Sequence, residues 1–152
     1  STSTALISHI LTCAGKKAVA CGNFGVPILD IVEQNPDYLV TEISSYQLHY
    51  CKTLSPRVAV WMNLTPDHIE WHGNLERYIE AKQKLFKNQG SNQHAVLNAD
   101  DPIVSEFRPK SEIFPFSVET ELEASVQGAF MQYGFLAYRV DGRTQILCHK
   151  DD

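Results

Sequence analysis

The sequence predicts an α/β fold in which a largely parallel sheet is flanked by helices, with an antiparallel portion near the C-terminus. Short apolar segments alternate with segments of helical periodicity, the order that βαβ units require. From about Ile113 onward the pattern changes to paired strands around the turn Asp141-Gly142, a two-residue sequence typical of hairpins. The predicted strands are 17–21, 38–43, 58–62, 95–97, 135–140 and 145–149.

Three segments predict helices. Residues 1–14 repeat apolar side chains with helical spacing, and Gly15 is a suitable stop. Pro27 favours the first turn of a second helix over 27–34, because proline lacks the N–H that a first turn leaves unpaired. Asn74 is a good N-cap for a third helix over 75–88.

Composition predicts an ordinary cytoplasmic globular domain. The 152 residues are 43% apolar and 20% charged, with a net charge of −5. No apolar run approaches the roughly 18 residues of a membrane helix, and no dense basic cluster indicates nucleic acid. We therefore expect neither a membrane nor a nucleic-acid partner. The four cysteines are widely spaced, which favours reduced thiols over disulfides or a zinc site.

Polar clusters follow four of the predicted strands directly. In open α/β sheets, ligands bind beyond the carboxyl ends of the strands, so parallel strands would bring these clusters to one edge. Loops are polar in any case, but four such clusters together favour a binding site. They are 22–25, 42–47, 63–72 and 98–101.

The residue types within these clusters leave several roles open. Glu42, at a strand tip, is suited to bind Mg²⁺, or it is a solvated loop residue. His68 could bind metal or substrate, although a lone loop histidine more often does neither. Lys82 offers donors and no lone pair, and nothing in its spacing separates it from Lys84 and Lys87. Its chemistry alone favours a solvated position.

Six segments within residues 1–102 occur in an order that resembles the Mur ligases, the ATP-dependent amino-acid ligases of peptidoglycan precursor synthesis. They are STSTALISHIL, GNFGVPILD, TEISSYQL, NLTPDHIEWHG, YIEAKQKLF and VLNADDP. The segments GNFGVP and SSYQL resemble the members that add D-glutamate. Ser1-Thr2 would then be the end of a phosphate-binding loop, G-x-x-x-x-G-K-[ST], whose first half precedes residue 1.

This resemblance implies a role for each matching residue. Lys82 matches a lysine that is carbamylated in the family, and a carbamate could bind metal where an ammonium cannot. His68 and Lys82 are the implied catalytic residues, and Ser1 and Thr2 the implied ATP-binding residues. The implied ligands of two Mg²⁺ ions are Ser1, Glu42, His68 and Lys82. The implied substrate-binding residues are Asn23, Ser44, Gln47 and His68.

The resemblance also implies the reaction. A full-length parent, expected to be a monomer, would activate the carboxylate of UDP-N-acetylmuramoyl-L-alanine with ATP as an acyl phosphate, which D-glutamate then attacks. Residues 1–152 would form part of the central ATP-binding domain. We expect the UDP-binding domain, the first half of the phosphate loop and the C-terminal ligase domain to lie outside this chain. The isolated chain should therefore have no ligase activity.

Three other interpretations compete with this one. The parent could be a Mur-type ligase for a different amino acid, or a non-catalytic nucleotide-binding domain descended from such a ligase. The joint presence of Glu42, His68 and Lys82 argues against the second. A metallohydrolase built on Asp67, His68 and His72 is the weakest, because no second ligand cluster completes it.

Overall fold

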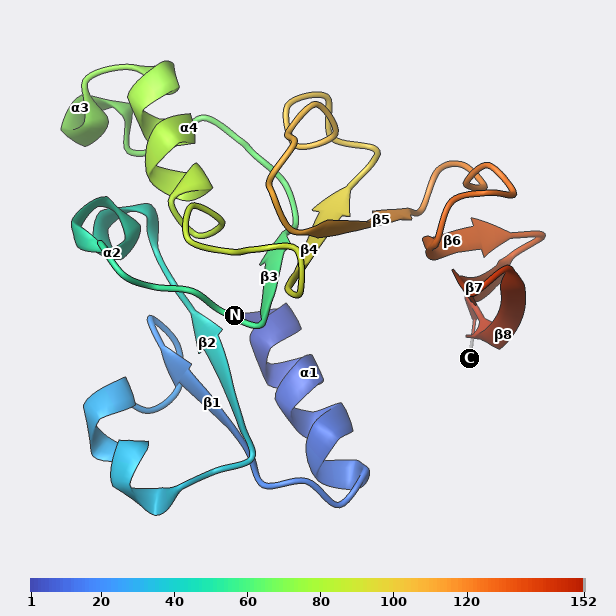
Figure 1. Ribbon diagram of the computed structural model, residues 1–152, viewed down its shortest axis with the longest axis horizontal. Helices are drawn as coiled ribbons and strands as arrows, with labels where there is room; N and C mark the ends of the chain where they lie inside the picture. Colours follow the sequence, from blue (N-terminus) through green and yellow to red (C-terminus); the bar gives the residue numbers. More distant parts are fainter. Residues whose placement is uncertain (152) are drawn as a thin grey trace. The chain divides into compact units, whose positions relative to one another are not determined.

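The computed structural model describes residues 1–151, and its contacts divide the chain into two compact units. Unit 1 is Ser1–Tyr50 and unit 2 is Cys51–Asp152. Each unit contains its own sheet and helices, so the predicted α/β class is confirmed (Figure 1). Among residues 1–151, no helix combines the length and the apolar character that crossing a membrane would need.

Unit 1 is a small βαβ-like layer. Strands β1 (Ala18–Gly22) and β2 (Tyr38–Glu42) pair in parallel, from Ala18↔Tyr38 to Gly22↔Glu42. Helix α1 (Thr2–Cys13) precedes them and contacts both strands (Figure 1). Helix α2 (Ser45–Tyr50) follows β2 almost at once.

The predicted helix over 27–34 is wrong. The segment forms two short 3₁₀ turns, Ile28–Asp30 and Val32–Gln34. Pro27 lies outside the first turn, with an extended ψ of 137°, and Ile31 at φ −123° interrupts the segment. Asn35, in the left-handed region at φ 49°, ends the second turn. Helix α2 was not predicted, because six residues are too few to show a helical period.

Unit 2 is organised around a six-stranded sheet with its strands in sequence order. The first three of its five strand pairs are parallel and the last two are antiparallel. The strands are β3 (Val58–Trp61), β4 (His94–Asn98), β5 (Glu112–Ser117), β6 (Gly128–Gln132), β7 (Phe135–Val140) and β8 (Arg143–His149). The expectation of antiparallel strands from Ile113 onward is therefore wrong for β5, which pairs in parallel with both neighbours.

The hairpin between β7 and β8 confirms the turn at Asp141-Gly142. Both residues have positive φ, 50° and 72°, as a type I′ turn requires. Tyr133-Gly134, with φ of 50° and 82°, makes a second turn of this kind between β6 and β7. These two turns, rather than the composition of the strands, make this end of the sheet antiparallel.

Two helices stand between β3 and β4. Helix α3 (Ile69–His72) lies within the polar cluster 63–72, where no helix was predicted. Helix α4 (Leu75–Gln83) begins at the predicted cap, where Asn74 Oδ1 accepts a hydrogen bond from Arg77 N at 2.9 Å. It ends earlier than predicted, because the chain tightens into turns in which Leu85 N and Phe86 N donate to carbonyls three residues back.

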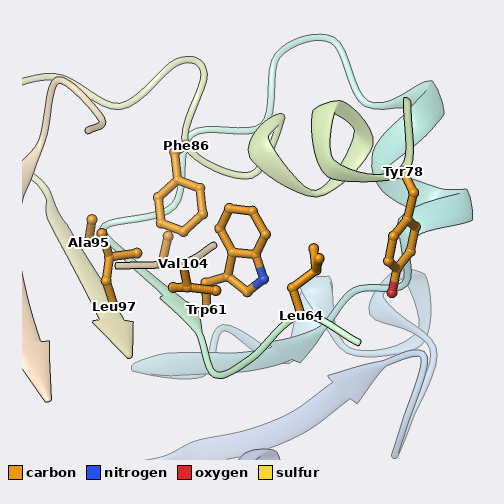
Figure 2. Packing of buried hydrophobic residues seen from close by; sticks show 8 residues of the cluster. Trp61, Leu64, Tyr78, Phe86, Ala95, Leu97 and Val104 are labelled. Atoms are coloured by element: carbon orange, nitrogen blue, oxygen red, sulfur yellow. The ribbon is translucent and has the colours of Figure 1, made fainter. Parts of the chain in front are cut away.

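The core of unit 2 is aromatic (Figure 2). The ring of Trp61 lies 6.1 Å from that of Phe86 and 5.5 Å from that of Phe107, measured between centroids. Ala95 and Val104 are fully buried beside them. Leu64, 8% exposed, reaches into the same cluster and fixes the segment after β3. All four cysteines are free; Cys21 is buried, whereas Cys13 and Cys148 are exposed.

A buried amide joins the amino ends of three strands of this sheet. Gln89 is 2% exposed, and its Nε2 donates to Pro56 O (3.0 Å) and His94 O (3.1 Å). Its Oε1 accepts from Ser111 Oγ at 2.9 Å. We expect Gln89→Ala to lower the free energy of unfolding by about 3 kcal/mol, about 1 kcal/mol for each lost bond.

Chemical denaturation monitored by tryptophan fluorescence would measure this loss. Gln83→Ala, at the end of α4, is the matched control and should change the unfolding free energy by less than about 0.5 kcal/mol. Equal effects of the two substitutions would contradict the role assigned to Gln89.

Candidate functional site

The polar clusters lie at the carboxyl ends of parallel strands in both sheets. In unit 1, residues 22–25 and 42–47 follow the paired strands β1 and β2. In unit 2, residues 63–72 and 98–101 follow the paired strands β3 and β4. Two clusters therefore share an edge in each unit, whereas a single edge for all four stays a prediction.

Glu42 is the last residue of β2, and the neighbouring strand end holds it. Asn23 N donates to the Glu42 carbonyl at 2.8 Å, and Asn23 Nδ2 donates to Glu42 Oε1 at 3.0 Å. Gly22 allows this close approach, because a Cβ there would lie 2.3 Å from the Glu42 carbonyl oxygen. Asn23, a predicted substrate-binding residue, therefore positions the carboxylate of Glu42 in this structure.

The second carboxylate oxygen of Glu42 has few partners. Oε2 lies 2.8 Å from the backbone nitrogen of Ser1. Apart from that contact it is buried and has no hydrogen-bond partner among residues 1–151. A buried carboxylate oxygen with so few donors is well suited to bind a metal cation such as Mg²⁺.

The other predicted residues of unit 1 lie at two helix starts. Ser1 is the N-cap position of α1 and Thr2 its first residue. Ser44 and Gln47 bind each other at the start of α2: Ser44 N donates to Gln47 Oε1 at 2.8 Å, and Gln47 N donates to Ser44 Oγ at 3.3 Å. This S-x-x-Q arrangement is a capping box, and it is the signal that could have revealed α2 in the sequence.

In unit 2, His68 has a strained backbone. Its φ and ψ are 53° and 28°, in the left-handed region, which costs a non-glycine residue of the order of 1–2 kcal/mol. Asp67 supports it, since Oδ1 accepts from His68 N at 2.8 Å and Oδ2 lies 3.3 Å from His68 Nε2. Strain of this kind often marks functional positions.

Lys82 differs from a solvated lysine in its surroundings. It lies one helical turn after Tyr78 on α4, with Nζ 5.1 Å from the centroid of that ring. Burial lowers the pKa of the Lys82 ammonium, and the carboxylate of Asp67 opposes this shift. Burial and then Asp67 raise the pKa of Tyr78. Asp67, Tyr78 and Lys82 thus share one electrostatic environment, which corrects the solvated position that chemistry alone favoured for Lys82.

Tyr78 was not among the predicted site residues, although its ring contacts Lys82. Tyr78 is 5% exposed and does belong to the core. The available signal was its spacing, because residues four apart face the same side of a helix.

The predicted metal ligands divide between the units, with Ser1 and Glu42 in unit 1 and His68 and Lys82 in unit 2. Within the described residues, no three His, Cys, Asp or Glu side chains gather closely enough to hold a metal ion. The metallohydrolase interpretation gains no support, and the ring of His72 packs against Tyr78 at 5.3 Å. The four-ligand set remains a prediction.

The site thus contains a Ser-Thr start of α1, a carboxylate at the tip of β2 and a half-buried lysine on α4. The family model of the Mur ligase middle domain matches residues 1–142. The chain therefore belongs to the Mur ligase family.

The most informative relatives are UDP-N-acetylmuramoylalanine–D-glutamate ligases. The protein from Geobacter metallireducens is 38% identical over 148 residues, which is 95% of this chain and 32% of that protein. The protein from Pelotomaculum thermopropionicum is 35% identical over 155 residues, 99% of this chain and 33% of that protein. The chain thus spans about a third of the length of these relatives.

Solved structures show the same fold. A UDP-N-acetylmuramoyl-L-alanyl-D-glutamate–2,6-diaminopimelate ligase matches with a TM-score of 0.66 at 19% identity, over 95% of this chain and 36% of the other. The MurF ligase from Thermotoga maritima, in complex with ADP, matches with a TM-score of 0.64 at 23% identity. The match covers 97% of this chain and 37% of the MurF chain.

Proposed function

We propose that the protein containing this chain is an ATP-dependent ligase that joins D-glutamate to UDP-N-acetylmuramoyl-L-alanine. The chain itself would supply much of the ATP- and magnesium-binding domain. The observation that carries the proposal is the buried Oε2 of Glu42 beside the start of α1, which among the described residues contacts no donor other than the backbone nitrogen of Ser1. The names of the relatives support D-glutamate as the amino acid.

The reaction would proceed in two balanced steps. The substrate carboxylate attacks the γ-phosphorus of ATP, which forms an acyl phosphate and releases ADP. The amine of D-glutamate then attacks the acyl carbon, so that an amide forms, phosphate leaves and the amine loses a proton. Two Mg²⁺ ions, when bound, would neutralise the negative charge of the reacting phosphates.

Each predicted residue has a part in this reaction. Ser1 and Thr2 would bind phosphate at the start of α1, where backbone N–H groups are unpaired. Asn23, Ser44 and Gln47 would contact the muramoyl substrate. The Mg²⁺ ions would be held by Ser1, Glu42, His68 and a carbamylated Lys82.

Carbamylation of Lys82 is consistent with its environment. The neutral amine adds to CO₂, forming an N–C bond and releasing a proton, so an ammonium must first lose its proton. Partial burial lowers the pKa of Lys82 and thereby raises the fraction of neutral amine at a given pH. The product is a carboxylate-like group that can bind Mg²⁺, which a cationic lysine cannot.

The test is an assay of ADP release by the full-length protein with ATP, Mg²⁺ and UDP-N-acetylmuramoyl-L-alanine. D-glutamate should support turnover, while meso-diaminopimelate and L-lysine should not. Turnover with one of the latter instead would assign the protein to another branch of the family. Magnesium-dependent ATP binding without ADP release under any condition would favour a non-catalytic domain.

A further inference from the structure

The segment Asn98–Pro102 connects the carboxyl ends of three strands in unit 2. Asn98 Nδ2 donates to Met62 O, just after β3, at 2.8 Å. Asp100 accepts from Ser117 Oγ (2.6 Å) and from Val118 N (2.7 Å), at the end of β5. The segment thus fastens the end of β4 to both neighbouring strands.

The two carboxylate oxygens of Asp101 make different contacts. Oδ1 accepts from Ile103 N and Val104 N, both at 2.9 Å, and so caps the turn that follows. Oδ2 accepts from Leu64 N at 2.7 Å, 37 residues away in the sequence. Burial alone would raise the pKa of Asp101, but the N–H groups of Val104, Leu64 and Ile103 outweigh it and lower the pKa. Asp101 is therefore ionised at neutral pH.

We propose that Asp101 is a positioning residue that holds the segment carrying His68 through its bond to the Leu64 amide. The proposal rests on the function proposed above, in which His68 contacts Mg²⁺ and the muramoyl substrate. It gives the aspartate of the NADDP segment a role in the site without any contact with substrate.

Asp101 is connected to His68 through one hydrogen bond to Leu64 and the three residues that follow Leu64. Leu64 is fixed twice, by its amide on Asp101 and by its side chain in the core (Figure 2). The side chains of residues 65–67 are exposed, so Leu64 is the last buried side chain before His68. Pro66 restricts the backbone between them, and His68 holds a left-handed conformation that surrounding structure must maintain. Release of Leu64 would let that conformation relax.

The substitution Asp101→Asn isolates this bond. The amide keeps one acceptor oxygen, which can still cap Ile103 N and Val104 N, and then presents an NH₂ group to the Leu64 N–H. Two donors face each other and the Leu64 bond is lost. Asp100→Asn is the matched control, with the same chemical change at the neighbouring residue, whose partners are on β5. Asp101→Ser is a second test variant, because its short hydroxyl can cap the turn but cannot reach Leu64.

Two measurements on the full-length protein test the proposal. Hydrogen–deuterium exchange of a peptide covering residues 63–70 should become at least about tenfold faster in Asp101→Asn and Asp101→Ser, with no change in Asp100→Asn. The Mg²⁺ concentration for half-maximal ADP release should rise about 10- to 100-fold, as for other groups that orient metal ligands. The KM for ATP should change less than the Mg²⁺ requirement.

The positioning role would be overturned if residues 63–70 exchanged at the same rate in the Asp101 variants as in Asp100→Asn. It would also be overturned if the Mg²⁺ requirement of the Asp101 variants equalled that of Asp100→Asn. If Asp101→Asn does not fold, Asp101→Ser carries both measurements. If the unsubstituted protein releases no ADP, the proposed function fails, while the exchange measurement still decides whether Asp101 fixes residues 63–70.

Discussion

Replacement of Lys82 by alanine should lower kcat/KM for ligation by about 10³-fold in the full-length protein. The expected loss is the size seen when a preorganised group that stabilises charge is removed from an active site. Lys82→Arg should be equally inactive, because arginine keeps the positive charge but cannot form a carbamate. Equal losses of activity in Lys82→Ala and Lys82→Arg would indicate that Lys82 acts as a carbamate, which is an anionic ligand. If Lys82 acted as an ammonium through its charge, Lys82→Arg would keep part of the activity.

Two further measurements sharpen the result. Short carboxylates such as formate should partly restore Lys82→Ala, by supplying the oxygen ligands that the carbamate would have offered, and should leave Lys82→Arg inactive. In ¹³C NMR with labelled bicarbonate, the unsubstituted protein should give a carbamate signal whose intensity rises with pH, as the neutral amine increases. Lys87→Ala, an exposed residue of the same region, is the control and should retain activity within about threefold. Full activity of Lys82→Arg would contradict the carbamate.

Lys82 also shows how far the sequence can be interpreted without a structure. Its charge and spacing did not separate it from Lys84 and Lys87, and only the family resemblance did. The structure adds a physical reason, since the Tyr78 ring and partial burial distinguish it. Those contacts depend on how α4 packs, which is a long-range property that a local pattern does not contain.

The same division holds for the fold. The cap at Asn74 and the turn at Asp141-Gly142 were predictable, because both depend on a few adjacent residues. The direction of β5 was not, because a strand pairs according to partners far away in the chain. The sequence could not predict the contacts of Asn98, Asp100 and Asp101 for the same reason. It shows that the segment is polar, but not which distant residues it contacts.

Replacement of Glu42 by glutamine should raise the Mg²⁺ requirement by about 10- to 100-fold and lower kcat by about 10²-fold, as loss of an anionic metal ligand would. The fold should tolerate the change. Oε1 can still accept from Asn23 Nδ2, and among the described residues Oε2 contacts only the backbone nitrogen of Ser1. The free energy of unfolding should therefore fall by no more than about 1 kcal/mol, which thermal unfolding without Mg²⁺ would measure.

Glu33→Gln is the matched control, because Glu33 is an exposed carboxylate of the same unit. It should change neither the Mg²⁺ requirement nor kcat by more than about twofold. A large loss of stability in Glu42→Gln, with activity that falls only in proportion to the folded fraction, would mean that the carboxylate serves the fold. If Glu42→Gln keeps its stability but needs more Mg²⁺, the buried oxygen at the tip of β2 binds the cation.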